Sequence, residues 1–170
     1  MDNNVFDEIF NAYYKPIISF IYGYVGSFEE SKDLAQDVFV SVFKNYEKLK
    51  EKEKIKSWIF KIAANKSISF LRWRKIRNLL SLDLMEEEKD EDYLKNLIDE
   101  SQNAEEFIVK NEFIKKILKK LSDKERMILL LRAQGFSVKD ISSIRNISES
   151  TVKVHIFNAK NKLKDDLEGL

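Results

Sequence analysis

Four polar side chains at helical spacing could bind a nucleic-acid strand. Lys61, Asn65, Ser69 and Arg72 follow one another at intervals of four, four and three residues. On an α-helix these intervals place all four on one narrow stripe. An amide between two cations can hydrogen-bond a base while the cations hold phosphates. The stripe therefore predicts a nucleic-acid contact, and a solvated face on a core helix is the alternative interpretation.

A second set of candidate contacts lies on the last predicted helix. A projection at about 100° per residue turns an apolar set inward, namely Val152, Ile156, Ala159 and Leu163. The outward face carries Val154 and Phe157, which suit a major groove where apolar groups meet thymine methyls. Its polar members, expected at phosphates or base edges, are Ser150, Lys153 and Asn158. The alternative is that Phe157 packs against another helix.

The residue inventory argues against catalysis. The chain has no cysteine, so it holds no disulfide and no thiolate metal site. Its only histidine, His155, argues against a histidine metal site or a catalytic triad. There is no glycine-rich phosphate loop. The sequence predicts neither an enzyme nor a cofactor.

The elements that must position these residues are all predicted to be helices. Four glycines and one proline leave few turns, and 35% of residues are charged, which is typical of an all-α protein. Apolar periodicity predicts helices over residues 5–24, 31–45 and 57–77. Pro16 should kink or end the first helix early, and Ser31 is the expected N-cap of the second.

Cap and turn residues near the C-terminus predict a helix-turn-helix. A capping box opens one helix, a glycine ends it, and two serines cap the next two helices around a turn that needs a left-handed residue. In chain order these residues are Ser122 with Glu125, Gly135, Ser137, Asn146 and Ser148.

Charge alternates along the chain although the net charge is only +1. Residues 1–43 carry −5, residues 44–77 carry +9, residues 78–107 carry −9 and residues 108–170 carry +6. Two basic blocks indicate two contacts with a polyanion. The alternative is that lysine-rich helices are simply solvated.

The same boundaries predict two small helical domains joined by an acidic linker. The domains cover residues 5–77 and 108–168, and residues 78–107 form an acidic linker that is mostly extended or partly disordered. The alternative for the linker is a short helix around residues 93–98 that packs on one domain. The start of the chain lacks the pattern of a signal peptide, and no apolar stretch is long enough to span a membrane. We therefore expect a cytoplasmic protein.

Three motifs in this order resemble the bacterial RNA polymerase sigma factors of the extracytoplasmic-function (ECF) type. DLAQDVFVSVFKN, residues 33–45, is similar to the helix of that family that binds core polymerase. SWIFKIAANKSISFLRWRK, residues 57–75, is similar to its −10 promoter helix. LSDKERMILLLRAQGFSVKDISSIRNISESTVKVHIFNAKNKL, residues 121–163, is similar to its −35-binding domain.

The resemblance implies a role for each set of residues. The contacts with the β′ clamp helices of core RNA polymerase would come from Asp33, Leu34, Gln36, Asp37 and Phe39. The melted −10 strand would be read by Asn65, with Lys61, Ser69 and Arg72 beside it, and a flipped base would be held by Lys48, Leu49 and Lys50. Members of the family often have Phe at the position of Leu49.

The −35 element would be read by the last helix. Its contacts would come from Ser150, Thr151, Lys153, Val154, Phe157 and Asn158. Family members often carry arginine at the positions of His155 and Asn158, so the −35 sequence need not be the family's usual one. The resemblance also implies binding to the β flap of polymerase and an anti-sigma factor, often membrane-anchored. The rival hypothesis is a helix-turn-helix regulator that acts on promoter DNA without polymerase.

Overall fold

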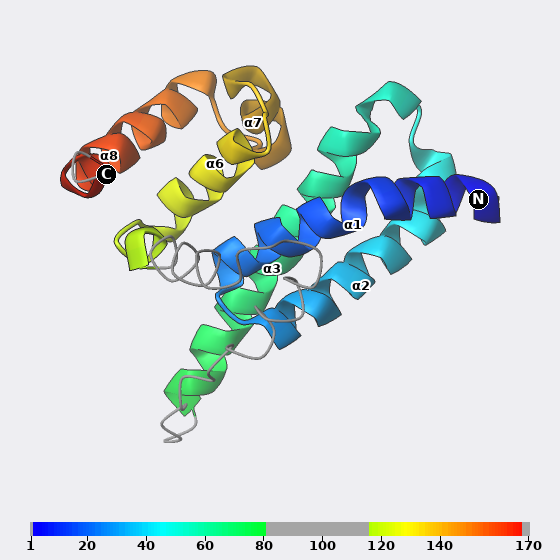
Figure 1. Ribbon diagram of the computed structural model, residues 1–170, viewed down its shortest axis with the longest axis horizontal. Coiled ribbons are helices and arrows are strands. Elements are labelled where there is room, and N and C mark those ends of the chain that lie inside the picture. Colours follow the sequence, from blue (N-terminus) through cyan, green and yellow to red (C-terminus); the bar gives the residue numbers. More distant parts are fainter. Residues whose placement is uncertain (1, 81–115, 168–170) are drawn as a thin grey trace, which may run out of the picture.

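The computed structural model describes residues 2–80 and 116–167, which contain helices and turns and no strand. The all-α prediction is confirmed for this part of the chain. No helix in it is long and apolar enough to cross a membrane. Figure 1 shows two groups of helices that lie against each other. In chain order the helices are α1 (Asn3–Val25), α2 (Phe28–Asn45), α3 (Ile55–Leu80), α6 (Asp123–Ala133), α7 (Val138–Arg145) and α8 (Glu149–Leu167).

Helix α1 continues past its proline. Its first turn is capped by Asp2, and its C-cap, directly after Val25, is Gly26, whose φ of 83° is left-handed. The predicted early break at Pro16 is wrong. The proline removes one backbone hydrogen bond, but the next turns bury Ile17, Phe20 and other apolar side chains. Burial of this face holds the helix together across the missing bond.

Helix α2 begins one turn earlier than its sequence predicts. Ser27 is the N-cap, and its hydroxyl accepts a hydrogen bond from the Glu30 amide. The predicted cap, Ser31, is wrong: it lies inside the helix, fully buried, and donates to the Ser27 carbonyl. Phe28 explains the difference because it is 4% exposed. Burying this ring draws the extra turn into the helix.

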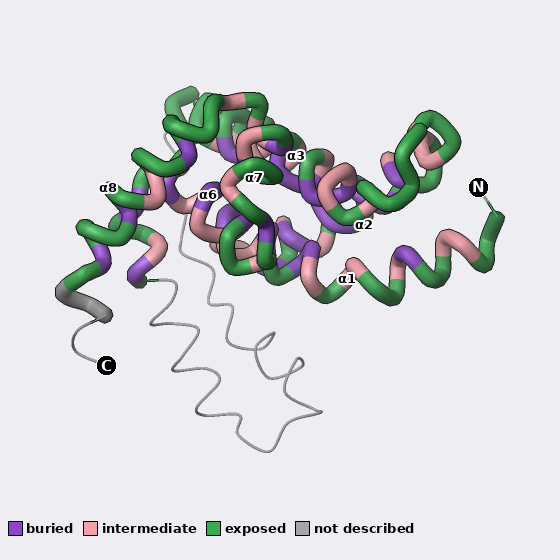
Figure 2. The backbone as a smooth tube through the Cα atoms, turned by 90° about the horizontal axis from the view of Figure 1, so that it is seen from above, coloured by how far each residue is buried: buried purple, intermediate pink, exposed green. Residues whose placement is uncertain are grey.

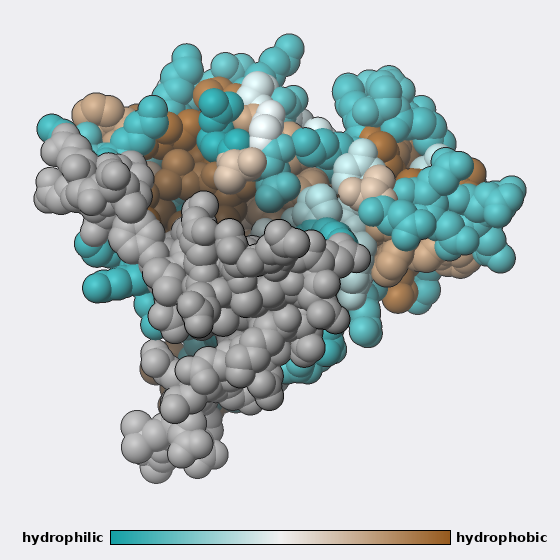
Figure 3. Space-filling model, viewed as in Figure 1, coloured by the Kyte–Doolittle hydropathy of each residue, from teal (hydrophilic) through white to brown (hydrophobic). Residues whose placement is uncertain are grey.

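The lysine-rich connection between α2 and α3 folds into two 3₁₀ turns, η1 (Tyr46–Lys48) and η2 (Lys52–Lys54). Lys52 closes the connection, since its Nζ lies 2.7 Å from the Tyr46 carbonyl oxygen and 3.6 Å from the Tyr46 ring centroid. Figure 3 shows this end of the molecule, at the upper right, as largely hydrophilic surface.

The three C-terminal helices form the predicted helix-turn-helix. Both Ser122 and Ser137 make reciprocal capping boxes, with Glu125 and Asp140. Asn146 adopts φ 52° and ψ 50°, the left-handed conformation that the turn requires. Further on, the amide of Thr151 donates to the Ser148 hydroxyl over 3.1 Å, so Ser148 caps α8. These local predictions are confirmed.

One hydrophobic core runs through both groups of helices (Figure 2). Phe60 of α3 lies at its centre, with ring centroids 5.3 Å from Phe20 and 5.1 Å from Phe136. A smaller cluster joins α8 to the segment before α6, and it consists of Ile117, Leu121, Ala159 and Leu163. The charge and periodicity of the sequence did not predict that the two groups pack together. The predicted linker lies almost wholly outside the described residues, which resume at residue 116.

Candidate nucleic-acid interface

The stripe on α3 exists as predicted. Lys61, Asn65, Ser69 and Arg72 are all exposed, whereas Ile59 and Ala63 on the other side of the helix are fully buried. Of the stripe's members, Asn65 has a partner from outside its own helix. Its Oδ1 accepts a hydrogen bond from Nη1 of Arg145, at the end of α7, over 3.3 Å.

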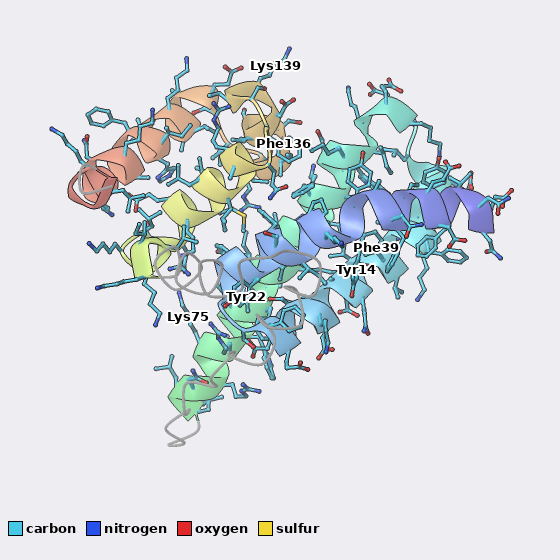
Figure 4. All side chains as sticks on the ribbon, viewed as in Figure 1. Tyr14, Tyr22, Phe39, Lys75, Phe136 and Lys139 are labelled. Atoms are coloured by element: carbon cyan, nitrogen blue, oxygen red, sulfur yellow. The ribbon has the colours of Figure 1, made fainter. Side chains whose placement is uncertain are left out.

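The neighbouring face of α2 is polar and exposed. It presents Asp33, Gln36 and Asp37. Asp37 also faces α3, because one of its carboxylate oxygens lies 3.7 Å from Nζ of Lys66. The two apolar members of this predicted set point inward: Leu34 is 9% exposed and Phe39 only 2%. In Figure 4, Phe39 lies beside Tyr14 of α1, and their ring centroids are 6.0 Å apart.

A shallow groove of about 510 Å³ separates the α2 face from the α3 stripe. Its lining combines apolar and polar side chains from both helices: Leu34, Asp37, Asn65, Lys66, Ser69, Phe70 and Trp73. Trp73 is 54% exposed, so its ring forms an open wall of the groove. Lys66 and Phe70 were not among the site residues predicted from the sequence. The signal that could have found them is their spacing of four residues, with Trp73 three residues further on, which places them in a row beside the stripe.

Two of the exposed cations in the connection between α2 and α3 belong to the predicted site. Lys48 and Lys50 are exposed and Leu49 is half-buried between them. The ammonium of Lys48 donates to the Asn45 side-chain oxygen over 2.9 Å, which ties the turn to the end of α2.

The outward face of α8 is also arranged as predicted. Phe157 is 64% exposed and Val154 is 55% exposed, so the alternative in which Phe157 packs against another helix is wrong for the described residues. The polar residues of this face are exposed too: Ser150, Thr151, Lys153 and Asn158. His155 is half-buried at the edge. Exposing the side chains of Val154 and Phe157 to water costs free energy unless a partner covers them.

An ion pair between Glu125, which is 4% exposed, and the more exposed Lys162 fixes α8 on α6. The carboxylate of Glu125 accepts two hydrogen bonds from Nζ of Lys162, at 3.0 and 2.8 Å, and one from the Ser122 amide. These bonds, with that of Lys162 first, lower the pKa of Glu125 to about 2 although burial opposes the shift. The pair sets the angle at which α8 presents its outward face.

The arrangement suits the binding of a nucleic acid. Within residues 2–80 and 116–167, no group of three or more acidic, histidine or cysteine side chains could hold a metal ion. The exposed sets consist of cations, amides, hydroxyls and aromatic rings, which contact phosphates, base edges and base faces.

Comparison with known proteins gives the same two-part division. Residues 9–76 match the family profile described as Sigma-70 region 2, and residues 114–163 match Sigma-70, region 4. The chain is 26% identical to the RNA polymerase sigma factor YlaC of Bacillus subtilis (strain 168), with 95% of this chain and 91% of YlaC covered. It is 27% identical to the ECF RNA polymerase sigma factor SigW of the same strain, with 99% and 92% covered.

A solved structure shares the fold. It is the sigma factor RpoE of Bartonella quintana, in complex with the anti-sigma factor NepR. The TM-score is 0.71 at 20% identity, with 96% of each chain covered.

Proposed function

The chain belongs to the sigma-70 family of bacterial RNA polymerase sigma factors, in its ECF branch, and we propose that its exposed side chains divide the work of such a factor among three surfaces. It is an alternative sigma factor that directs promoter-specific transcription initiation. A sigma factor is a regulator, and the polymerase is the enzyme, so we assign no reaction and no cofactor to this chain.

The first surface is the exposed face of α2, which binds the β′ clamp helices of core RNA polymerase. Asp33, Gln36 and Asp37 supply the polar contacts, because their side chains are exposed on this face. Leu34 and Phe39 contribute indirectly to this binding, because their burial fixes how α2 packs on α1 and α3.

The second surface is the α3 stripe with the turn before it, which binds the opened −10 strand. Asn65 has one donor group and one acceptor for a base edge. Lys61, Ser69 and Arg72 hold the strand on either side, and Lys48, Leu49 and Lys50 hold a base turned out of the stack. Unstacking a base costs a few kcal/mol, which these contacts offset.

The third surface is the outward face of α8, which enters the major groove at the −35 element. Val154 and Phe157 meet thymine methyls, and Ser150, Thr151, Lys153 and Asn158 contact phosphates and base edges. The exposure of Phe157, at 64%, is the observation that carries this assignment.

The other proposed partners are the β flap of polymerase and an anti-sigma factor, either membrane-anchored or free. RpoE of Bartonella quintana is bound to such a factor in its solved structure. We place the protein in the cytoplasm, where sigma factors meet polymerase and promoter DNA. A stand-alone helix-turn-helix regulator is not favoured, because that hypothesis does not account for the match of residues 9–76 to Sigma-70 region 2.

Transcription in vitro with core RNA polymerase on fragmented genomic DNA, with the start sites sequenced, tests the function. We expect initiation at promoters that share two elements. Asn65→Ala should lower promoter opening by about tenfold, because one good base contact contributes roughly 1–3 kcal/mol, and should leave polymerase binding intact. Asp37→Arg should weaken polymerase binding instead.

Two results would contradict these assignments. Absence of specific initiation on any fragment would rule out the sigma function. Loss of both polymerase binding and promoter opening in Asn65→Ala would mean that Asn65 supports the fold instead of reading a base.

A further inference from the structure

Helix α3 is basic well beyond the stripe around Asn65. Its 26 residues include seven lysines and arginines and no acidic residue. Two of these cations are matched by carboxylates of other helices, since Arg74 pairs with Glu30 of α2 at 2.9 Å and Lys75 with Asp123 of α6 at 2.7 Å. The remaining positive charge runs along the whole helix, so a polyanion is attracted along its length and not at the stripe alone.

The groove between α2 and α3 continues the stripe. Asn65, Ser69 and Trp73 follow one another at spacings of four residues, and all three line the groove. At a rise of about 1.5 Å per residue, Trp73 lies roughly 12 Å further along α3 than Asn65. The turn with Lys48 and Lys50 precedes α3, so it lies on the other side of Asn65. A strand that runs along the stripe from this turn therefore reaches the groove after Asn65.

Trp73 presents a supported aromatic surface to this groove. Its side chain is 54% exposed, although a ring of this size is costly to leave in water. The guanidinium of Arg77 lies over the ring, 4.5 Å from its centroid, and the Phe70 ring lies beside it with a centroid distance of 6.4 Å. Arg77 and Phe70 hold the indole in place, and this leaves the face of the ring opposite Arg77 for a flat ligand.

The other walls of the groove suit a nucleobase. Its volume of about 510 Å³ falls within the range of small-ligand sites, roughly 300–1,000 Å³. Leu34 and Phe70 supply apolar walls, and Lys66 and Asp37 supply a donor and an acceptor 3.7 Å apart. Bases have apolar faces and carry both donors and acceptors along their edges. The groove therefore matches the face and the edge of a base.

We propose that this groove holds a further base of the opened −10 strand, stacked on Trp73, in addition to the bases at Asn65 and at the turn. The proposal rests on the proposed function, which puts the opened strand on α3. Since 12 Å is about four stacked steps at roughly 3.4 Å each, the base lies within about four nucleotides of the Asn65 base, on the side away from the turn. Stacking accepts any base, so the groove adds affinity and register rather than sequence preference.

An abasic scan of the strand tests the stacking contact. The probe is a single-stranded oligonucleotide with the −10 sequence of a promoter found by transcription in vitro, bound to core polymerase that carries this chain. An abasic nucleotide keeps the phosphate and removes the base. At one position on the predicted side of the Asn65 base, it should lower affinity about 5- to 100-fold. With Trp73→Ala, the abasic and intact oligonucleotides should bind equally at that position.

Two further variants control for a change in the helix itself. Trp73→Phe keeps an aromatic ring and should retain the abasic effect. Ile76→Ala removes an apolar side chain that is 51% exposed on the same helix but does not line the groove, and it should behave as the wild type. Loss of the abasic effect in Ile76→Ala would contradict the proposal, because it would show that the effect does not depend on the groove.

The dependence of binding on salt separates stacking from a phosphate contact. An indole ring releases no counterions, so Trp73→Ala should lower affinity without changing the slope of log affinity against log salt concentration. Arg72→Gln should instead reduce the slope by about 0.7, the value for one phosphate of a single strand. A reduced slope in Trp73→Ala would overturn the proposal, because it would show that the ring serves to hold Arg77 at a phosphate.

The outcomes separate this proposal from the proposed function. If the wild type initiates transcription but Trp73→Ala changes the abasic effect at no position, the stacking site is refuted and the sigma function stands. If Trp73→Ala weakens binding to core polymerase in the absence of DNA, the groove belongs to the polymerase contact around Asp37, and the proposal is refuted as well. If the wild type never initiates, the sigma function fails and the stacking site falls with it.

Discussion

The two groups of helices are specified in different ways. Helices α1, α2 and α3 have 23, 18 and 26 residues and are held by a broad aromatic and aliphatic core. Helices α6 and α7 have only 11 and 8 residues, and each begins with a capping box. Isolated helices shorter than about 12–15 residues are marginal in water, so the short pair depends on its caps.

The difference extends to the proposed binding residues. In the N-terminal group they lie on faces defined by what the helix buries, so the stripe around Asn65 follows from the burial of Ile59 and Ala63. In the C-terminal group they lie on α8, whose direction is set by the left-handed Asn146 and by the ion pair of Glu125 with Lys162. Substitutions in the buried core and substitutions at caps, turns or the ion pair should therefore differ in how much stability they remove and from which group.

The largest effect is expected at Phe60, whose ring contacts side chains of both groups. If the two groups were independent, removal of this ring would destabilise the N-terminal group alone. Phe60→Ala removes a fully buried ring that contacts both groups. It should lower the free energy of unfolding by about 3–5 kcal/mol and destabilise both groups in urea unfolding followed by circular dichroism. Phe157→Ala, which removes a 64% exposed ring, is the control and should change it by less than about 0.5 kcal/mol. Unchanged stability of the helix-turn-helix in Phe60→Ala would show that the shared core does not couple the groups.

A smaller effect, confined to the C-terminal group, is expected from acid. The pKa of Glu125 is lowered to about 2 by its bonds to Lys162 and Ser122. A lowered pKa stabilises the fold above the unfolded value near 4.5, and this contribution, on the order of 2 kcal/mol, is lost as the pH falls toward 2. Glu125→Gln should flatten the dependence of unfolding free energy on pH in that window, and Lys162→Met should flatten it too. A wild-type pH profile in Glu125→Gln would show that the ion pair does not hold α8.

The smallest effect is expected at the turn. Asn146→Ala should destabilise the protein by about 1 kcal/mol, because alanine lacks the short polar side chain with which asparagine tolerates the left-handed conformation. Asn146→Gly should be neutral or slightly stabilising, since glycine adopts it freely. Thermal melting of the two variants makes the measurement, and equal losses in both would point to a role of the Asn146 side chain itself.

Local signals in the sequence predicted the C-terminal group closely and the N-terminal group less so. The caps at Ser122, Ser137 and Ser148 and the left-handed Asn146 were all predicted, because each depends on residues within a few positions. The N-cap of α2 is Ser27 and not the predicted Ser31. Glu30 stands three residues after Ser27, which is capping-box spacing, whereas Leu34 stands three residues after Ser31, so a local signal was present and the burial of Phe28 agrees with it. At Pro16, by contrast, packing outweighed a local helix breaker.

What the sequence determined by itself is the set of helices and which face of each is polar, because periodicity and capping are short-range properties. The stripe around Asn65 and the outward face with Phe157 follow directly from it. Only the tertiary structure decided that Phe136 packs on Phe60, that Leu130 seats against Gly23 and that Arg145 reaches Asn65. Those contacts join residues about 80 to 110 positions apart, and no local pattern encodes which two apolar faces will meet.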